Sequence, residues 1–148
     1  MKKIFALLLA LVMMLSLAAC GGKEETTVSD VAVAMVTDYG DITDQSFNQT
    51  TYEACKEFCE AEGLTFEYFK PATDSDDDRI AMIENAIDSG YNVVVLPGFA
   101  FANAIIATAD NYPEVKFVAL DVSEFDLTGN GWTIPENVYS AVYQEEIS

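Results

Sequence analysis

The chain has 148 residues, of which 51% are hydrophobic, and it carries 25 acidic and 7 basic side chains, no histidine and a formal net charge of −18. That length allows one domain at most, and such an acidic chain repels nucleic acids and anionic membrane surfaces. The absence of histidine excludes Ser-His-Asp and Cys-His catalytic systems and imidazole metal sites.

The first 19 residues have the pattern of a secretion signal. Residues 1–3 are Met-Lys-Lys, which is a positive amino-terminal region, and residues 4–15 are almost wholly apolar. This apolar run is shorter than the stretch of about 20 residues that a permanent membrane helix needs. We therefore expect export of the protein with removal of residues 1–19.

Cys20 is the predicted attachment point of a lipid. The preceding Leu17-Ala18-Ala19 together with Cys20 resembles the lipobox of bacterial lipoproteins, which implies cleavage before Cys20 and diacylglyceryl attachment to its thiol. The alternative is a plain signal peptide that leaves an ordinary thiol. Residues 20–30 are predicted to form a flexible, lipidated tether to the cell membrane, on its outer or periplasmic face. Removal of residues 1–19 takes away two lysines and no acid, so the formal charge becomes −20.

Apolar runs that alternate with helical patterns predict a doubly wound, mostly parallel α/β sheet. The strand-like runs are short and apolar, with aromatic residues in the run 64–69, and the helical patterns end at glycine or proline signals. A polar segment over 123–135 is predicted to be a loop. The predicted strands are 31–36, 64–69, 91–96, 115–120 and 137–143, and the predicted helices are 45–62, 74–89 and 101–109.

The acidic run at residues 74–78 begins like a calcium loop but departs from that motif. Arg79 stands where the loop requires glycine, and Asn85 stands where it requires a bidentate glutamate. We interpret the run as a helix cap, because negative charge in a first turn is favourable by about 0.3–1 kcal/mol. No metal site is expected.

Cys55 and Cys59 lie four residues apart within one predicted helix. That spacing is unfavourable for the torsion of a disulfide. We interpret Cys55 as a small core residue and Cys59 as its flank, with a functional thiol pair as the alternative.

The ligand crevice of a parallel α/β sheet lies beyond the carboxyl ends of its strands. In this sequence those ends carry Asp38, Gly98, Phe99 and Asp121. An ionised carboxylate accepts hydrogen bonds from ligand hydroxyl or N–H groups, although it can also simply cap a turn. The two acids could also form an acid–base pair, but no partner defines a reaction. Dinucleotide and P-loop motifs are absent, so no cofactor is expected.

Phe47 and Asn48 stand at the start of the first predicted helix, above the expected crevice. A Phe ring can stack on a flat heterocycle while an amide donates and accepts hydrogen bonds at its edge. The alternative is that Phe47 is the first core residue of the helix.

Residues 33–49, which end in Asp44-Gln45-Ser46-Phe47-Asn48-Gln49, resemble the opening signature of the basic membrane protein family. Members of this family are nucleoside-binding lipoproteins of ABC transporters. Weaker matches follow in order along the exported chain, at residues 95–99, 112–117, 120–121, 137–138 and 144–146.

The resemblance implies a type I periplasmic-binding-protein fold, in which two lobes close over a purine-type nucleoside. By position, Asp38 and Asn48 match the residues that hydrogen-bond the base, and Phe47 matches the aromatic that stacks on it. Asp121 matches an acid of the same pocket, and Gly98 and Phe99 match its lining loop. The implied partners are ABC permease subunits, and no enzymatic step is implied.

Family members continue well beyond the length of this chain, so the resemblance implies that residues 31–148 are a partial, incomplete amino-terminal lobe. Such a lobe alone is expected to show no saturable nucleoside binding. Two alternatives stay open: a sugar-binding protein of the same fold, and a lipoprotein that presents an acidic surface to another protein.

Overall fold

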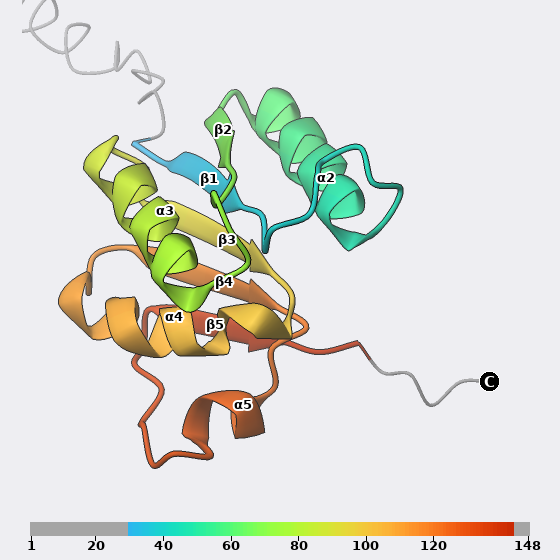
Figure 1. Ribbon diagram of the computed structural model, residues 1–148. Coiled ribbons are helices and arrows are strands. Elements are labelled where there is room, and N and C mark those ends of the chain that lie inside the picture. The colour runs from blue at the N-terminus through green and yellow to red at the C-terminus, as the bar shows by residue number, and fades with distance from the viewer. Residues whose placement is uncertain (1–29, 144–148) are drawn as a thin grey trace, which may run out of the picture.

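The computed structural model describes residues 30–143, which form a five-stranded sheet in the order β2-β1-β3-β4-β5 (Figure 1). Every strand pair is parallel. The predicted signal peptide, Cys20 and the rest of the tether before residue 30 lie outside the described residues. The strands are β1 (Ala32–Val36), β2 (Thr65–Phe69), β3 (Val93–Pro97), β4 (Lys116–Leu120) and β5 (Val138–Ala141).

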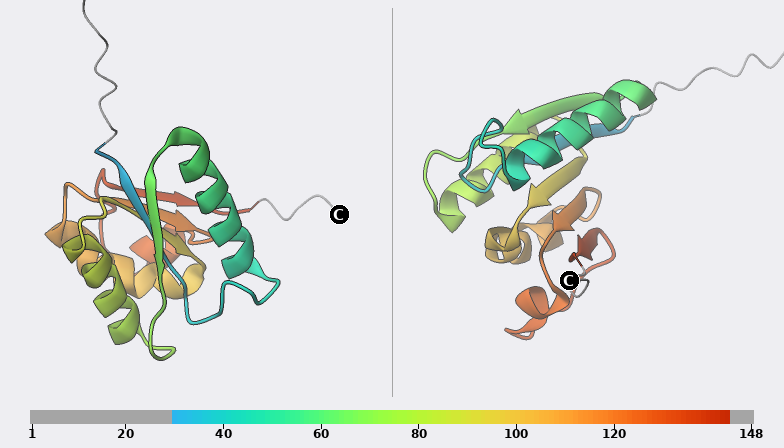
Figure 2. Two further views of the ribbon diagram at one scale, coloured as in Figure 1. Left: turned by 90° about the horizontal axis from the view of Figure 1, so that it is seen from above. Right: turned by 90° about the vertical axis from the view of Figure 1, so that its right-hand side faces the viewer.

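Helices cover the two faces of the sheet unequally. Helices α3 and α4 lie on one face, with α5 beyond α4, whereas α2 alone lies on the other face, over β2, β1 and β3 (Figures 1 and 2). The predicted α/β fold with a parallel sheet is confirmed. The helices are α2 (Phe47–Glu62), α3 (Asp76–Asp88), α4 (Ala102–Thr108) and α5 (Glu124–Thr128), with short 3-10 turns η1 (Phe99–Phe101) and η2 (Ala109–Asn111) around α4.

Capping residues set the limits of the two long helices. Ser75 caps α3 by accepting a hydrogen bond from the backbone N–H of Asp78, and the first turn of α3 holds three aspartates. This arrangement agrees with the interpretation of the acidic run as a helix cap. Gly63 ends α2 in the left-handed conformation, with φ of 67°.

Two hydrophobic cores correspond to the two faces. The larger core joins β3 and β4 to α3 and α4, and Phe101 and Phe117 are fully buried in it. The smaller core packs α2 on β1 and β3, around Met35 and Cys59. Since the strands are buried on both faces only where a helix lies over them, the α2 face of β4 and β5 is more open.

The predicted loop over 123–135 is wrong in its first half, which forms α5. Ser123 and Asp126 make a capping box, in which each side chain accepts a hydrogen bond from the other residue's backbone N–H, and Leu127 is buried against the larger core. The helix has five residues, so it is too short to produce a helical period in the sequence.

The interpretation of Cys55 as the core residue and Cys59 as its flank is also wrong. Cys59 is the buried thiol, at 1% exposure, whereas Cys55 is partly exposed, and both are free. Burial raises the pKa of the Cys55 thiol to about 11, and the neighbouring Cys59 adds to the shift. A thiol with so high a pKa is almost fully protonated at neutral pH and is a poor nucleophile.

Asn137 explains why the last strand begins where it does. Its buried side-chain amide donates hydrogen bonds to the carbonyl oxygens of Ala109, Tyr112 and Val115, at 3.0–3.1 Å. These bonds connect the start of β5 to the segment between α4 and β4.

Among residues 30–143, no helix is both long enough and apolar enough to cross a membrane.

Candidate ligand site at the strand ends

The sheet order brings the predicted site residues to one edge. Asp38 follows β1, Gly98 follows β3 and Asp121 follows β4, and these strands are neighbours in the order β1-β3-β4. Since adjacent strands lie about 4.8 Å apart, the ends of β1 and β4 are separated by about 10 Å. The backbone N–H of Gly98 donates a hydrogen bond to the carbonyl oxygen of Leu120 at 2.7 Å, which links the ends of β3 and β4.

The carboxylate of Asp38 is held on one oxygen and free on the other. Its Oδ1 accepts hydrogen bonds from the backbone N–H groups of Tyr39 at 2.6 Å and Gly40 at 2.8 Å, and from Asn48 Nδ2 at 2.8 Å. Among the described residues, Oδ2 has no hydrogen-bond partner. The side chain is therefore fixed in place while keeping an acceptor for a ligand donor.

Asn48 is positioned by α2 and is 5% exposed. Its Nδ2 also lies 3.5 Å from Asp44 Oδ2, and its Oδ1 is buried without a partner within residues 30–143. An unpaired buried amide oxygen is uncommon, because burial without a hydrogen bond costs about 1–3 kcal/mol. The structure thus brings the side chains of Asp38 and Asn48 together.

Gly40 makes this close arrangement possible. A Cβ on residue 40 would lie 2.4 Å from Asn48 Nδ2, 2.9 Å from Asp44 Oδ2 and 3.3 Å from Asp38 Oδ1. A Cβ at this position would displace the Asn48 and Asp44 side chains, so the turn after β1 favours glycine for close approach rather than for its backbone angles.

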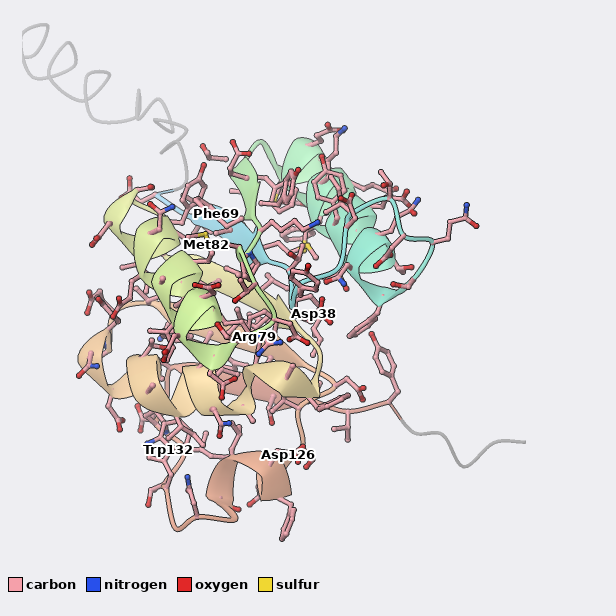
Figure 3. The ribbon with its side chains drawn as sticks, viewed as in Figure 1. Asp38, Phe69, Arg79, Met82, Asp126 and Trp132 are labelled. Carbon is pink, nitrogen blue, oxygen red and sulfur yellow. The ribbon has the colours of Figure 1, made fainter. Side chains whose placement is uncertain are left out.

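The side chain of Arg79, a residue of α3, lies beside Asp38 (Figure 3). It is 6% exposed, and its Nε donates to the backbone carbonyl of Asp38 at 3.0 Å. Its guanidinium also pairs with Asp74 and Asp76 and lies 6.0 Å from the ring centroid of Phe101. Arg79 therefore ties the end of β1 to the first turn of α3 and to the turn after β3.

The environment of Asp38 keeps it ionised. Partial burial by itself would raise its pKa, but the hydrogen bonds from Gly40, Asn48 and Tyr39, together with the positive charge of Arg79, outweigh burial and lower the pKa below 3.8. At neutral pH the side chain is a carboxylate that accepts and cannot donate.

The β3 and β4 ends are built differently from the β1 end. Gly98 has φ of 113° and ψ of 149°, a conformation essentially restricted to glycine, and Phe99 after it is 72% exposed. Asp121 has φ of 59°, which is uncommon for a residue other than glycine, and its backbone N–H donates to Ala141 at 2.7 Å. Its carboxylate makes no hydrogen bond to any described residue.

Phe47 lies at the rim of the site and belongs to neither core. Its ring is partly exposed and meets the ring of Tyr143 edge-on, with centroids 5.7 Å apart and an interplanar angle of 77°. The two rings therefore form a T-shaped pair beside the strand-end residues.

Sequence reasoning missed Gly40, Asp44 and Arg79 as parts of the site. In the sequence, Arg79 serves only to exclude a calcium-binding motif. A single cation directly after the acidic run 74–78 is nevertheless a usable signal of an ion pair. The role of Gly40 depends on where Asn48 lies, so it became visible only in the structure.

The chemistry available at this edge is recognition by hydrogen-bond acceptors and aromatic surfaces. Within residues 30–143, no group of three or more Asp, Glu or Cys side chains is arranged to hold a metal ion. The cluster of Asp38, Asp44 and Asn48 offers acceptors to a ligand that carries N–H or O–H donors, and it repels phosphate.

Comparison with known proteins assigns the chain to a family. Residues 31–147 match the family model described as Bmp, ABC transporter substrate-binding protein PnrA-like. The chain belongs to this family. The Bmp family comprises solute-binding proteins of ABC transporters, which are not a class of enzyme.

Individual relatives agree with the family match. An uncharacterized lipoprotein of Pyrococcus furiosus is 30% identical over 138 residues, which are 93% of this chain and 32% of the relative. The ABC transporter nucleoside-binding protein BmpA of Lactococcus lactis is 33% identical over 104 residues, 68% of this chain and 28% of BmpA. The chain thus spans about a third of the length of the curated relatives it matches.

A solved structure shares the fold. The ABC transporter solute-binding protein of Conexibacter woesei superposes with a TM-score of 0.63 at 25% identity, covering 76% of this chain and 35% of that one. The fold prediction is therefore supported by both the internal topology and an independent structure.

Proposed function

We propose that residues 31–148 form part of the amino-terminal lobe of a lipid-anchored nucleoside receptor, which captures a purine-type nucleoside for an ABC permease. The observation that carries the proposal is the Asp38–Asn48 pair, in which one carboxylate oxygen and one amide oxygen remain without partners among the described residues. The unpaired oxygen of Asp38 suits a ligand N–H donor, and the buried Asn48 Oδ1 lacks a donor among the described residues.

The aromatic residues around the pair support a flat ligand. Phe47 begins the same helix as Asn48 and is partly exposed, and Phe99 is exposed beyond β3. A purine ring can stack on Phe47 while its edge meets Asp38 and Asn48. Asp121, at the end of β4, is then the acceptor for a more distant donor such as a ribose hydroxyl.

Charge favours an unphosphorylated ligand. Asp38, Asp41, Asp44 and Asp121 follow or flank the strand ends, and the whole chain carries a net charge of −18. A phosphate group would meet repulsion on all sides, whereas a nucleoside is neutral.

The nucleoside-binding protein BmpA of Lactococcus lactis, as a relative, and the lipobox-like end at Cys20 support the rest of the proposal. In it, a diacylglyceryl group on Cys20 anchors the exported protein to the membrane, and residues 20–30 tether the lobe. Closure of a second lobe would exclude water and complete the ligand contacts before delivery to the permease.

Calorimetric titration tests the proposed ligand class. The chain is compared with a chimera in which it is followed by the part of Lactococcus lactis BmpA that lies beyond the matched region. We expect the chimera to bind guanosine or adenosine saturably with micromolar affinity, and the 148-residue chain to show no saturable binding. Free ribose should not compete in the chimera.

Two results would redirect the proposal. Equal binding of ribose and nucleosides by the chimera would identify a sugar receptor of the same fold. Micromolar guanosine binding by the 148-residue chain alone would show that one lobe suffices, which contradicts the proposed need for closure.

A further inference from the structure

Two buried polar atoms near the end of β1 have no hydrogen-bond partner within residues 30–143. They are the hydroxyl oxygen of Thr37, a residue that is 0% exposed, and the side-chain amide oxygen of Asn48, which is 5% exposed. No other fully buried side-chain polar atom in the described part of the chain lacks a partner. Buried polar groups of native proteins are almost always hydrogen-bonded to protein or to ordered water, so these two exceptions require a physical explanation.

The hydroxyl of Thr37 lies on the α2 side of the sheet. The backbone N–H of Thr37 donates a hydrogen bond to the carbonyl oxygen of Phe69 at 2.9 Å, so Thr37 continues the pairing of β1 with β2. Successive side chains of a strand point to opposite faces. Met35 packs in the smaller core against α2 and Val36 packs in the larger core, so the alternation directs Thr37 toward α2.

The side chain of Asn48 reaches the same place from the helix. Asn48 and Thr51 are both 5% exposed and lie three residues apart, so they share the face of α2 that packs on the sheet. Asn48 Nδ2 donates to Asp38 Oδ1 at 2.8 Å, and Asp38 directly follows Thr37 in the chain. The two unpartnered oxygens therefore lie between the first turn of α2 and the end of β1.

The hydrogen bond to Asp38 fixes which end of the Asn48 amide needs a donor. If the amide were turned over, its oxygen would meet Asp38 Oδ1, and two acceptors repel each other. The buried amide oxygen therefore needs a donor from the interior. The hydroxyl of Thr37 can donate and accept, but no hydrogen bond joins it to Asn48 directly.

A single water molecule satisfies both atoms. It can donate to the amide oxygen of Asn48 and accept from the hydroxyl of Thr37, and the hydroxyl of Thr51 on the same helical face offers a third partner. Internal waters typically make two to four hydrogen bonds of this kind to polar groups that would otherwise be unsatisfied.

We propose that one internal water molecule is bound between Thr37 and Asn48, beneath the first turn of α2, and that Thr37 is a positioning residue of the strand-end site. The water holds the amide of Asn48 so that Nδ2 stays directed at Asp38. Thr37 is fully buried, so it acts on the site only through the water and Asn48. An amide oxygen has two lone pairs, so the water leaves one of them free. The inference concerns the protein without ligand and stands whichever ligand the site binds.

Stability measurements distinguish a hydroxyl that binds water from a hydroxyl that has no partner. Thr37→Val keeps the size of the side chain and suits a strand, but it removes the hydroxyl. If the hydroxyl had no partner, its removal would relieve the cost of burying it, and the urea midpoint would rise. If the hydroxyl holds the water, its removal leaves Asn48 Oδ1 and the water short of a partner. We expect the midpoint to fall by about 0.5 M.

The pKa of Asp38 reports whether Thr37 positions Asn48. Carboxyl NMR of the 148-residue chain should show this pKa rising in Thr37→Val, because the hydrogen bond from Asn48 that lowers it is weakened. Thr37→Ser retains the hydroxyl and should leave the pKa unchanged. Thr108→Val is the matched control, because Thr108 is another buried threonine, and its hydroxyl donates to the carbonyl oxygen of Ala104 at 2.7 Å within α4. It should also leave the pKa of Asp38 unchanged.

A measurement on the unchanged chain decides the question if Thr37→Val does not fold. Nuclear Overhauser effects between water and the side-chain amide protons of Asn48 should reveal a long-lived internal water. The same effects should persist in Thr108→Val.

Three results would overturn the proposal. The first is a urea midpoint that rises or stays the same in Thr37→Val. The second is the absence of water–Asn48 Overhauser effects in the unchanged chain. The third is a shift of the Asp38 pKa in Thr37→Ser or Thr108→Val as large as the shift in Thr37→Val.

Discussion

The two halves of the strand-end crevice are built on different principles. At the β1 end, Asp38 is held by three hydrogen bonds and backed by the buried Arg79. At the β3 and β4 ends, Gly98 and Asp121 have positive φ angles, and no described residue hydrogen-bonds the carboxylate of Asp121. The β1 end is therefore held by side-chain hydrogen bonds, whereas the backbone conformation shapes the other end.

Among the changes at the two ends, loss of Arg79 should reduce the unfolding free energy most. Arg79→Met removes the hydrogen bond to the Asp38 carbonyl and leaves Asp74 and Asp76 exposed enough to be solvated. We expect a loss of about 2–3 kcal/mol in unfolding free energy, typical of a charged hydrogen bond whose buried partner stays behind. Urea denaturation measures it. Lys56→Met is the control, because its ion pair is exposed on both sides and should contribute less than about 0.5 kcal/mol.

A pair of glycine substitutions should separate the two principles. Gly40→Ala places a Cβ against Asn48 and Asp44, and the resulting overpacking should cost about 1–3 kcal/mol. Gly98→Ala meets no atom within 4 Å, so its cost arises only from the backbone angle. Carboxyl NMR should show the pKa of Asp38 rising in Gly40→Ala, because the Asn48 bond is displaced. An unchanged Asp38 pKa in Gly40→Ala would contradict the account.

The pH dependence of stability should distinguish Asp38 from Asp121. The folded pKa of Asp38 lies below its ordinary value of 3.8, so its contribution is present above pH 3.8 and is lost as pH falls through the folded value. Asp38→Asn should therefore reduce the loss of stability between pH 5 and pH 2, as urea midpoints at both pH values would show. Asp121→Asn should retain that loss, since its carboxylate makes no hydrogen bond to any described residue.

The smallest effects are expected at the two rim aromatics. Phe99→Ala should change the unfolding free energy by less than about 0.5 kcal/mol, because the ring is 72% exposed. Phe47→Ala loses its edge-on contact with Tyr143 and should cost about 0.5–1.5 kcal/mol. Thermal unfolding of both variants shows which one loses more stability. A larger loss for Phe99→Ala than for Phe47→Ala would contradict this prediction.

The sequence was sufficient for the parallel α/β fold, because short apolar runs alternate regularly with helical periods along the chain. It was insufficient for α5, which is shorter than two helical turns and whose capping box looks like ordinary loop composition. It also placed Asp38 and Asn48 at the same crevice, since Asp38 follows the first strand and Asn48 lies at the start of the next helix. The hydrogen bond from Arg79 to the Asp38 carbonyl and the close approach of Asn48 to Gly40 depend on distances across the fold, which no local pattern encodes.

The guanosine affinity of the chimera with and without Asn48 tests the central claim most directly. Calorimetry should show at least a 100-fold loss for Asn48→Ala, while Gln49→Ala retains the affinity, because the hydrogen bonds of Gln49 go to Gln45 and Glu53 and not to Asp38. Thermal unfolding confirms that both variants are folded. Equal affinity of the unchanged and Asn48→Ala chimeras would contradict a nucleobase site built on Asp38 and Asn48.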